Sequence, residues 1–143
     1  MEKKILYLLT CVGLCWSSCT NEVDEFIGNV EPSTRSVSTA LNANLASLFT
    51  GGAPTLTSAE IKEVNDAYAK MTSINCYRNI DEAVRNKTSY AGTIFLDDTY
   101  ASAYFRKGSL AFPPYGILAS SMEHEFIHMY EREVQGKKVD TDK

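Results

Sequence analysis

The chain contains only two histidines, His124 and His128, and they lie four positions apart. Residues four apart share one face of an α-helix, one turn above the other, whereas along a strand they would be about 13 Å apart. The apolar residues from Gly116 to about Val134 have helical periodicity, so this segment is predicted to be one long helix. The two imidazoles are therefore expected side by side on that helix, with Glu125 completing the sequence His-Glu-x-x-His.

Three further helices are predicted upstream of the long helix. Apolar residues at helical spacing predict one helix over residues 37–49. A second helix is expected to begin at Thr57, because Thr57 and Glu60 have the spacing of a capping box. A short third helix is predicted over residues 80–86.

Between the third helix and the long helix, the sequence changes to residues typical of strands. Strands are predicted at Tyr90–Leu96, Thr99–Arg106 and Ser109–Phe112, and turn residues separate them at 97–98 and 107–108. Helices followed by a small antiparallel sheet and then a long helix define an α+β fold.

The first 18 residues have the composition of a signal peptide. A short basic region precedes an apolar run over residues 5–16, which is too short to span a bilayer as a helix. Small residues then lead to Cys19. This pattern resembles a bacterial lipoprotein signal, although Trp16 stands where a leucine-like residue is usual. The resemblance implies cleavage before Cys19 and attachment of lipid to its thiol, whereas an ordinary secretory signal or short membrane anchor is the alternative.

The segment after the signal is polar and predicts a tether over residues 19–36, followed by one domain over residues 37–143. Its acidic stretch at residues 20–25 looks like the tags of surface lipoproteins in some Gram-negative bacteria. The predicted location is therefore the Gram-negative cell envelope, with the chain lipid-anchored at the outer membrane or cell surface.

The charge balance excludes some partners. The chain has 18 acidic and 14 basic residues and a net charge of −4, which argues against nucleic acid as a partner.

Three of its four cysteines lie within the first 19 residues, which excludes a cysteine-rich zinc site in the domain.

The His-Glu-x-x-His sequence has a direct chemical interpretation. Two imidazoles one helical turn apart can reach a single zinc ion at about 2.0–2.1 Å. A glutamate beside the first histidine projects next to the metal, where it can take a proton from a metal-activated water and pass it to a leaving amine.

From about residue 93 to residue 135, the chain resembles the active-site half of a zincin metallopeptidase. The resemblance implies a zinc cofactor, His124 and His128 as zinc ligands, Glu125 as general base, and a peptide or protein substrate. In zincins a sheet lies over the active-site helix, and an edge strand of that sheet aligns the substrate backbone. Either Ser109–Phe112 or Tyr100–Phe105 is expected to be that strand.

The motif supplies two zinc ligands, whereas a catalytic zinc site has three protein ligands and a water. One explanation is that the chain is truncated after the active-site helix and lacks the third ligand. Another is Glu131, which lies on the same helix face as the histidines. A third is an upstream carboxylate, Asp97 or Asp98. The residues after His128 do not follow the metzincin pattern, which excludes that subgroup.

Two functions follow from these patterns. The first is zinc-dependent hydrolysis of peptide bonds in a membrane-anchored lipoprotein, with Glu125 as the general base. The second is a catalytically inactive, zincin-like surface lipoprotein that acts as a binding module.

Overall fold

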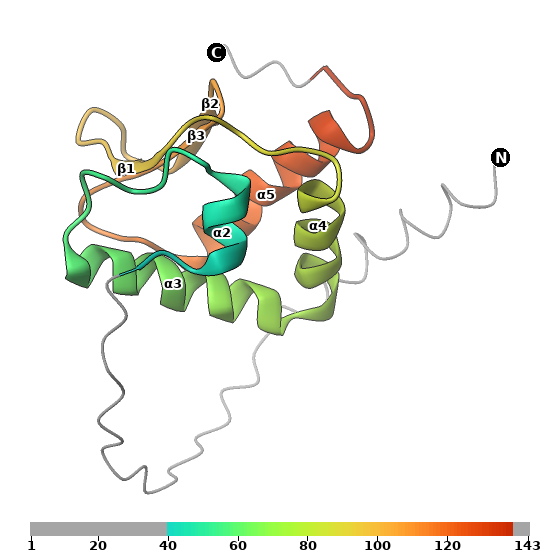
Figure 1. Cartoon of the computed structure of the whole chain (residues 1–143). Helices are drawn as coiled ribbons and strands as arrows, with labels where there is room; N and C mark the ends of the chain where they lie inside the picture. The colour runs from blue at the N-terminus through green and yellow to red at the C-terminus, as the bar shows by residue number, and fades with distance from the viewer. Residues whose placement is uncertain (1–39, 139–143) are drawn as a thin grey trace, which may run out of the picture. The chain divides into compact units, whose positions relative to one another are not determined.

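The computed structural model describes residues 40–138 (Figure 1). The predicted signal over 1–18, the lipidation site Cys19 and the tether over 19–36 lie outside the described residues. No helix within residues 40–138 has the length and apolar character that crossing a membrane requires.

The described part of the chain contains four helices and one small sheet, which confirms the α+β class. The helices are α2 (Ala43–Leu48), α3 (Ser58–Ser73), α4 (Asn75–Arg85) and α5 (Ala119–Glu133). The strands are β1 (Ile94–Leu96), β2 (Tyr104–Arg106) and β3 (Ser109–Phe112).

The direction of one strand pair differs from the prediction. The sheet has the order β1-β3-β2, with β3 parallel to β1 and antiparallel to β2. The sheet is thus mixed, and the expectation of a purely antiparallel sheet is wrong. The connection over residues 97–103 is long enough to carry the chain from β1 past the width of one strand, so β3 returns between the other two. The central position suits β3 because Leu110, Ala111 and Phe112 are all buried.

The hairpin between β2 and β3 is confirmed at the predicted turn. Lys107 and Gly108 both have positive φ, 50° and 77°, as two-residue turns between antiparallel strands require. Gly92 lies against this turn, since a Cβ at Gly92 would come within 2.2 Å of the Gly108 carbonyl oxygen. A glycine at position 92 is therefore needed for the chain before β1 to approach the hairpin.

The beginnings of α3 and α4 show how far local signals determine a helix. The capping box is present: the Glu60 amide donates to Thr57 Oγ1 at 3.3 Å, and the Thr57 amide donates to Glu60 Oε2 at 2.6 Å. By contrast, α4 begins five residues before the predicted start. Only Ile74 separates it from α3, and Ile74 provides no capping side chain. A helix start without a polar capping residue has no local sequence signal by which it could be predicted.

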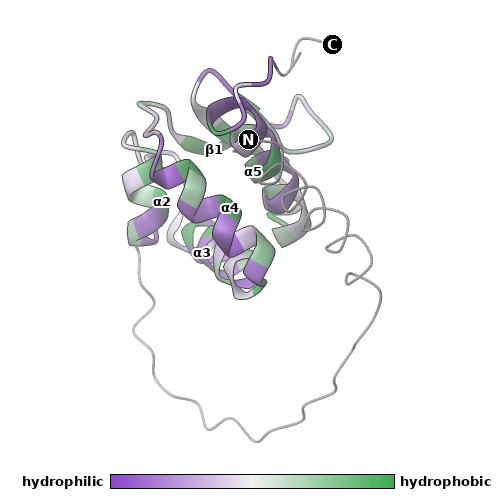
Figure 2. Ribbon diagram, turned by 90° about the vertical axis from the view of Figure 1, so that its right-hand side faces the viewer, coloured by the Kyte–Doolittle hydropathy of each residue, from purple (hydrophilic) through white to green (hydrophobic). Residues whose placement is uncertain are grey.

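The hydrophobic core lies against one face of α5. This helix packs against α3 and α4 and against β2, and Figure 1 shows it between the sheet and α3. Hydrophobic and hydrophilic residues alternate along α3, α4 and α5, as expected of amphipathic helices (Figure 2). The largest fully buried side chains are Phe49, Phe112, Phe126, Leu45, Leu48, Met71, Ile94, Leu110, Met122, Met129, Val64 and Val84. These contacts fix which face of α5 is turned away from the core.

Candidate metal centre

Helix α5 has a buried face and an accessible face. Met122, Phe126 and Met129 are completely buried. His124 is exposed, and the side chain of His128 is 32% exposed. Burial of the apolar face therefore directs both histidines away from the core.

The two imidazoles converge. The Nε2 atoms of His124 and His128 are 2.9 Å apart, and the ring planes are nearly perpendicular, at 88°. Two nitrogen ligands of a tetrahedral zinc ion are roughly 3.3 Å apart when each lies about 2.0–2.1 Å from the metal. The observed separation is within a few tenths of an ångström of that value. Without a metal, two neutral rings can share only one hydrogen bond, whereas a cation would bind both lone pairs. The pair thus fits two positions of a zinc site.

The electrostatic surroundings of His124 favour its neutral form. Burial lowers the pKa of His124, and the neighbouring His128 lowers it further. Only the neutral imidazole has a lone pair free for a metal.

The second nitrogen of His128 faces a carboxylate. Its Nδ1 is buried and has no hydrogen-bond partner among the described residues, while Glu131 Oε2 lies 3.8 Å away. Glu131 also forms an ion pair with Lys137 at 3.0 Å. Carboxylates next to the outer nitrogen of a metal-bound histidine orient the ring and increase its basicity. The position of Glu131 matches this supporting role.

The Glu131→Gln variant is expected to bind zinc about tenfold more weakly, because the amide loses the charge that would hold His128 Nδ1–H. Competition with a zinc-indicator dye measures the change, and Glu82→Gln, which removes an exposed carboxylate from α4, is the control. An unchanged affinity would contradict the supporting role. A loss as complete as that of a His128→Ala variant would instead assign Glu131 as a ligand.

Glu125 is one of two buried charged side chains among the described residues, and it is only 5% exposed. The other, Asp81, forms an ion pair with Arg85 at 2.9 Å. The structure gives Glu125 no cationic partner within residues 40–138. Burial raises the pKa of Glu125 to about 7, against a smaller lowering by a hydrogen bond from the backbone of Phe105. A carboxyl group with a pKa near neutrality can both accept and donate a proton.

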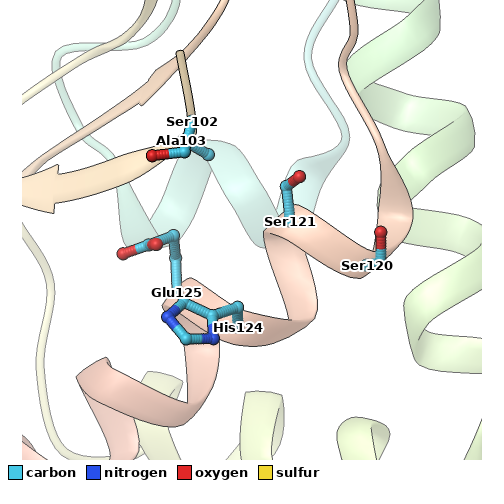
Figure 3. Close-up of a pocket in the computed structure, with 6 residues that line it drawn as sticks. All are labelled: Ser102, Ala103, Ser120, Ser121, His124 and Glu125. Carbon is cyan, nitrogen blue, oxygen red and sulfur yellow. The ribbon is translucent and has the colours of Figure 1, made fainter. Parts of the chain in front are cut away.

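A pocket of about 230 Å³ opens beside Glu125 and His124. Figure 3 shows Glu125 extending from α5 on the side of the segment that leads into β2. The lining residues are Ser102 and Ala103 from that segment, and Ser120, Ser121, His124 and Glu125 from α5. The pocket therefore lies between two residues of the predicted motif, His124 and Glu125, and the segment that leads into β2.

Sequence reasoning missed the serines of this pocket. Ser120 and Ser121 lie one turn before His124 and Glu125, so helical spacing could have found them. Ser102 carries no such signal, because only the packing of the sheet on α5 brings it to the pocket.

The upstream carboxylates do not lie with the histidines. Asp97 Oδ1 accepts from the Thr99 amide at 2.8 Å, and Asp97 Oδ2 accepts from the Tyr104 hydroxyl at 2.7 Å. The Thr99 hydroxyl also donates to Asp97 Oδ1. The Thr99 hydroxyl has the largest effect of these three donors, and together they lower the pKa of Asp97. Asp97 thus shapes the loop between β1 and β2. Within residues 40–138, no three His, Cys, Asp or Glu side chains are grouped to hold a metal, so neither Glu131, Asp97 nor Asp98 completes a three-ligand cluster there.

The structure also separates the two candidate edge strands. β3 (Ser109–Phe112) is the central strand. β2 overlaps the end of the other candidate, Tyr100–Phe105, and lies at an edge of the sheet next to α5. In an antiparallel ladder, alternate residues direct their N–H and C=O groups outward. Since Arg106 and Ser109 flank the two-residue turn, Phe105 and Ala103 are the residues whose backbone is directed to the open edge. This edge leads into the pocket at Ala103.

Comparison with protein-family models, with curated proteins and with solved structures finds no match to this chain.

Proposed function

We propose that the chain is a zinc-dependent peptidase whose site is built on α5. The observation that carries the proposal is the convergence of His124 and His128 at 2.9 Å beside a buried glutamate that has no cationic partner within residues 40–138. His124 and Glu125 also line one pocket, beside the segment that leads into the edge strand β2.

His124 and His128 would hold the zinc ion through their Nε2 atoms, with Glu131 supporting His128. When bound, zinc would polarise the peptide carbonyl and lower the pKa of a water to about 7. The fit rests on the spacing of the two nitrogens and on the buried Nδ1 of His128 beside a carboxylate.

Glu125 is the proton carrier in this proposal. As the water oxygen attacks the carbonyl carbon, Glu125 takes the water's proton. It then passes that proton to the nitrogen of the leaving amine while the C–N bond breaks, which gives a carboxylic acid and an amine. The restricted solvent access of Glu125 supports this role, because a buried carboxyl group exchanges protons with the substrate more readily than with bulk water.

The outer edge of β2 would hold the substrate backbone. An extended peptide paired with Ala103 adds a strand to the sheet and runs past Glu125 and His124. The proposed substrate is therefore a peptide or an unfolded segment of a protein.

The proposal includes the anchor. We infer that Cys19 carries lipid and that the domain is held at the outer membrane or cell surface of a Gram-negative bacterium. The support is the sequence of the first 25 residues alone.

Metal removal tests the proposal. Treatment of the purified full chain with a chelator is expected to abolish hydrolysis of a quenched-fluorescence peptide mixture, and stoichiometric zinc should restore it, since the water loses its activation without the metal. Hydrolysis that persists after complete zinc removal would contradict the mechanism. Zinc binding without hydrolysis of any peptide would favour the inactive binding module.

A further inference from the structure

We propose that the pocket beside Glu125 is a subsite for a short, uncharged, hydrogen-bonding side chain of the substrate, of the Ser, Thr or Asn class. The inference rests on the proposed function, because it assigns a specificity to the same site. Ser121 is the residue at its centre.

Three serines line the pocket from two sides. Ser120 and Ser121 come from the first turn of α5, and Ser102 comes from the segment before β2. Within the described part of the chain, none of the three hydroxyls has a hydrogen-bond partner. Figure 3 shows Ser120 and Ser121 on α5 and Ser102 on the segment across from it. Hydroxyl groups both donate and accept, so this lining can pair with a hydroxyl or an amide of a ligand.

Charge disfavours acidic and basic side chains. The lining contains the carboxyl group of Glu125 and no lysine or arginine, so an acidic ligand side chain would meet repulsion with no compensating cation. In the zinc-loaded chain, a basic side chain would be directed toward the cation that the histidines would hold. An apolar side chain would cover the hydroxyls and leave them without partners, which is unfavourable.

The size of the pocket limits the side chain. Pockets for drug-sized ligands measure about 300–1,000 Å³, whereas this one is about 230 Å³ and is open on one side. Part of that space would be taken by the peptide backbone. The remaining space is enough for one side chain of the peptide.

The route into the pocket follows from the strand edge. A peptide paired with the outward backbone of Ala103 has alternate side chains directed to opposite faces of the sheet. The face toward α5 is the one on which Ser121 and Glu125 lie. One side chain next to the cleaved bond would therefore enter the pocket.

The test uses a series of blocked alanine peptides in which one residue is replaced in turn by Ser, Asn, Leu, Asp or Lys. Affinity is measured by NMR titration of the zinc-free full chain, where no hydrolysis interferes, and kcat/KM is measured on the zinc-loaded chain. Peptides with Ser or Asn at one position are expected to bind the zinc-free chain about fivefold more tightly than those with Leu or Asp there. The peptide with Lys there is expected to have a kcat/KM about fivefold below that of the Ser peptide on the zinc-loaded chain.

Two variants locate the preference. Ser121→Ala removes a hydroxyl and keeps the space, so the advantage of Ser and Asn over Leu should fall to about twofold or less. Ser121→Leu fills the pocket and should weaken binding of the Ser and Asn peptides at least fivefold. The matched control is Ser58→Leu, at an exposed serine in the first turn of α3, which should leave every affinity unchanged.

A preference for Leu or Asp in the zinc-free chain would overturn the subsite. So would a Lys peptide that the zinc-loaded chain hydrolyses as well as the Ser peptide, or a Ser121→Leu chain that binds the series as the unaltered chain does. A different result would contradict the proposed function. If the zinc-free chain shows the Ser and Asn preference but the zinc-loaded chain hydrolyses none of the peptides, the subsite stands and the peptidase proposal does not.

Discussion

Replacement of Glu125 by glutamine is expected to lower kcat for peptide hydrolysis about a thousandfold, since general acid–base catalysis contributes roughly 10²–10⁴. The amide has nearly the same shape but can neither take the proton of the water nor return it to the amine. The histidine pair is untouched, so zinc affinity should change by less than about threefold. Because the amide also removes a buried charge without a cationic partner, the chain should remain folded.

The matched control for this variant is Glu123→Gln, which changes the preceding carboxylate of the same helix. Burial raises the pKa of Glu123 as well, against a lowering by Lys70. However, Glu123 does not line the pocket, so its loss should change kcat less than about threefold. A Glu125→Gln chain that keeps more than a tenth of the activity would show that another group carries the proton.

Truncation of Phe126 to alanine is expected to reduce the free energy of unfolding by about 3–5 kcal/mol. Phe126 is completely buried on the core face of α5, and its ring lies 6.2 Å from that of Tyr68 on α3. Loss of the ring leaves a cavity where α5 packs on α3. For a domain of this size, Tm should fall by about 15–30 °C.

Urea denaturation of the purified chain measures this change. Tyr115→Ala is the control, since Tyr115 is 72% exposed and its truncation should cost less than about 0.5 kcal/mol. A loss below about 1 kcal/mol for Phe126→Ala would mean that α5 does not hold the core together as described.

The parts of the fold that local chemistry determines could be predicted. The capping box at Thr57, the turn at Lys107–Gly108 and the face of α5 that carries the histidines each depend on residues within one or two turns of one another. Each is confirmed because nothing distant has to be known.

The parts that depend on distant contacts could not be predicted. The order β1-β3-β2 arises from competition among strands for the central position, which hydrophobicity alone did not resolve. Ser102 reaches the pocket only through that order. Glu131 shows an intermediate case: helical spacing placed it beside His128, but only the ring orientation revealed that it faces Nδ1.

Zinc analysis of the purified full chain, beside a His124→Ala/His128→Ala double variant, tests the central claim most directly. The account predicts close to one zinc ion per unaltered chain and only background zinc in the variant, with both chains folded. Equal zinc contents in the two chains, or zinc at background in both after exposure to a stoichiometric supply, would contradict it.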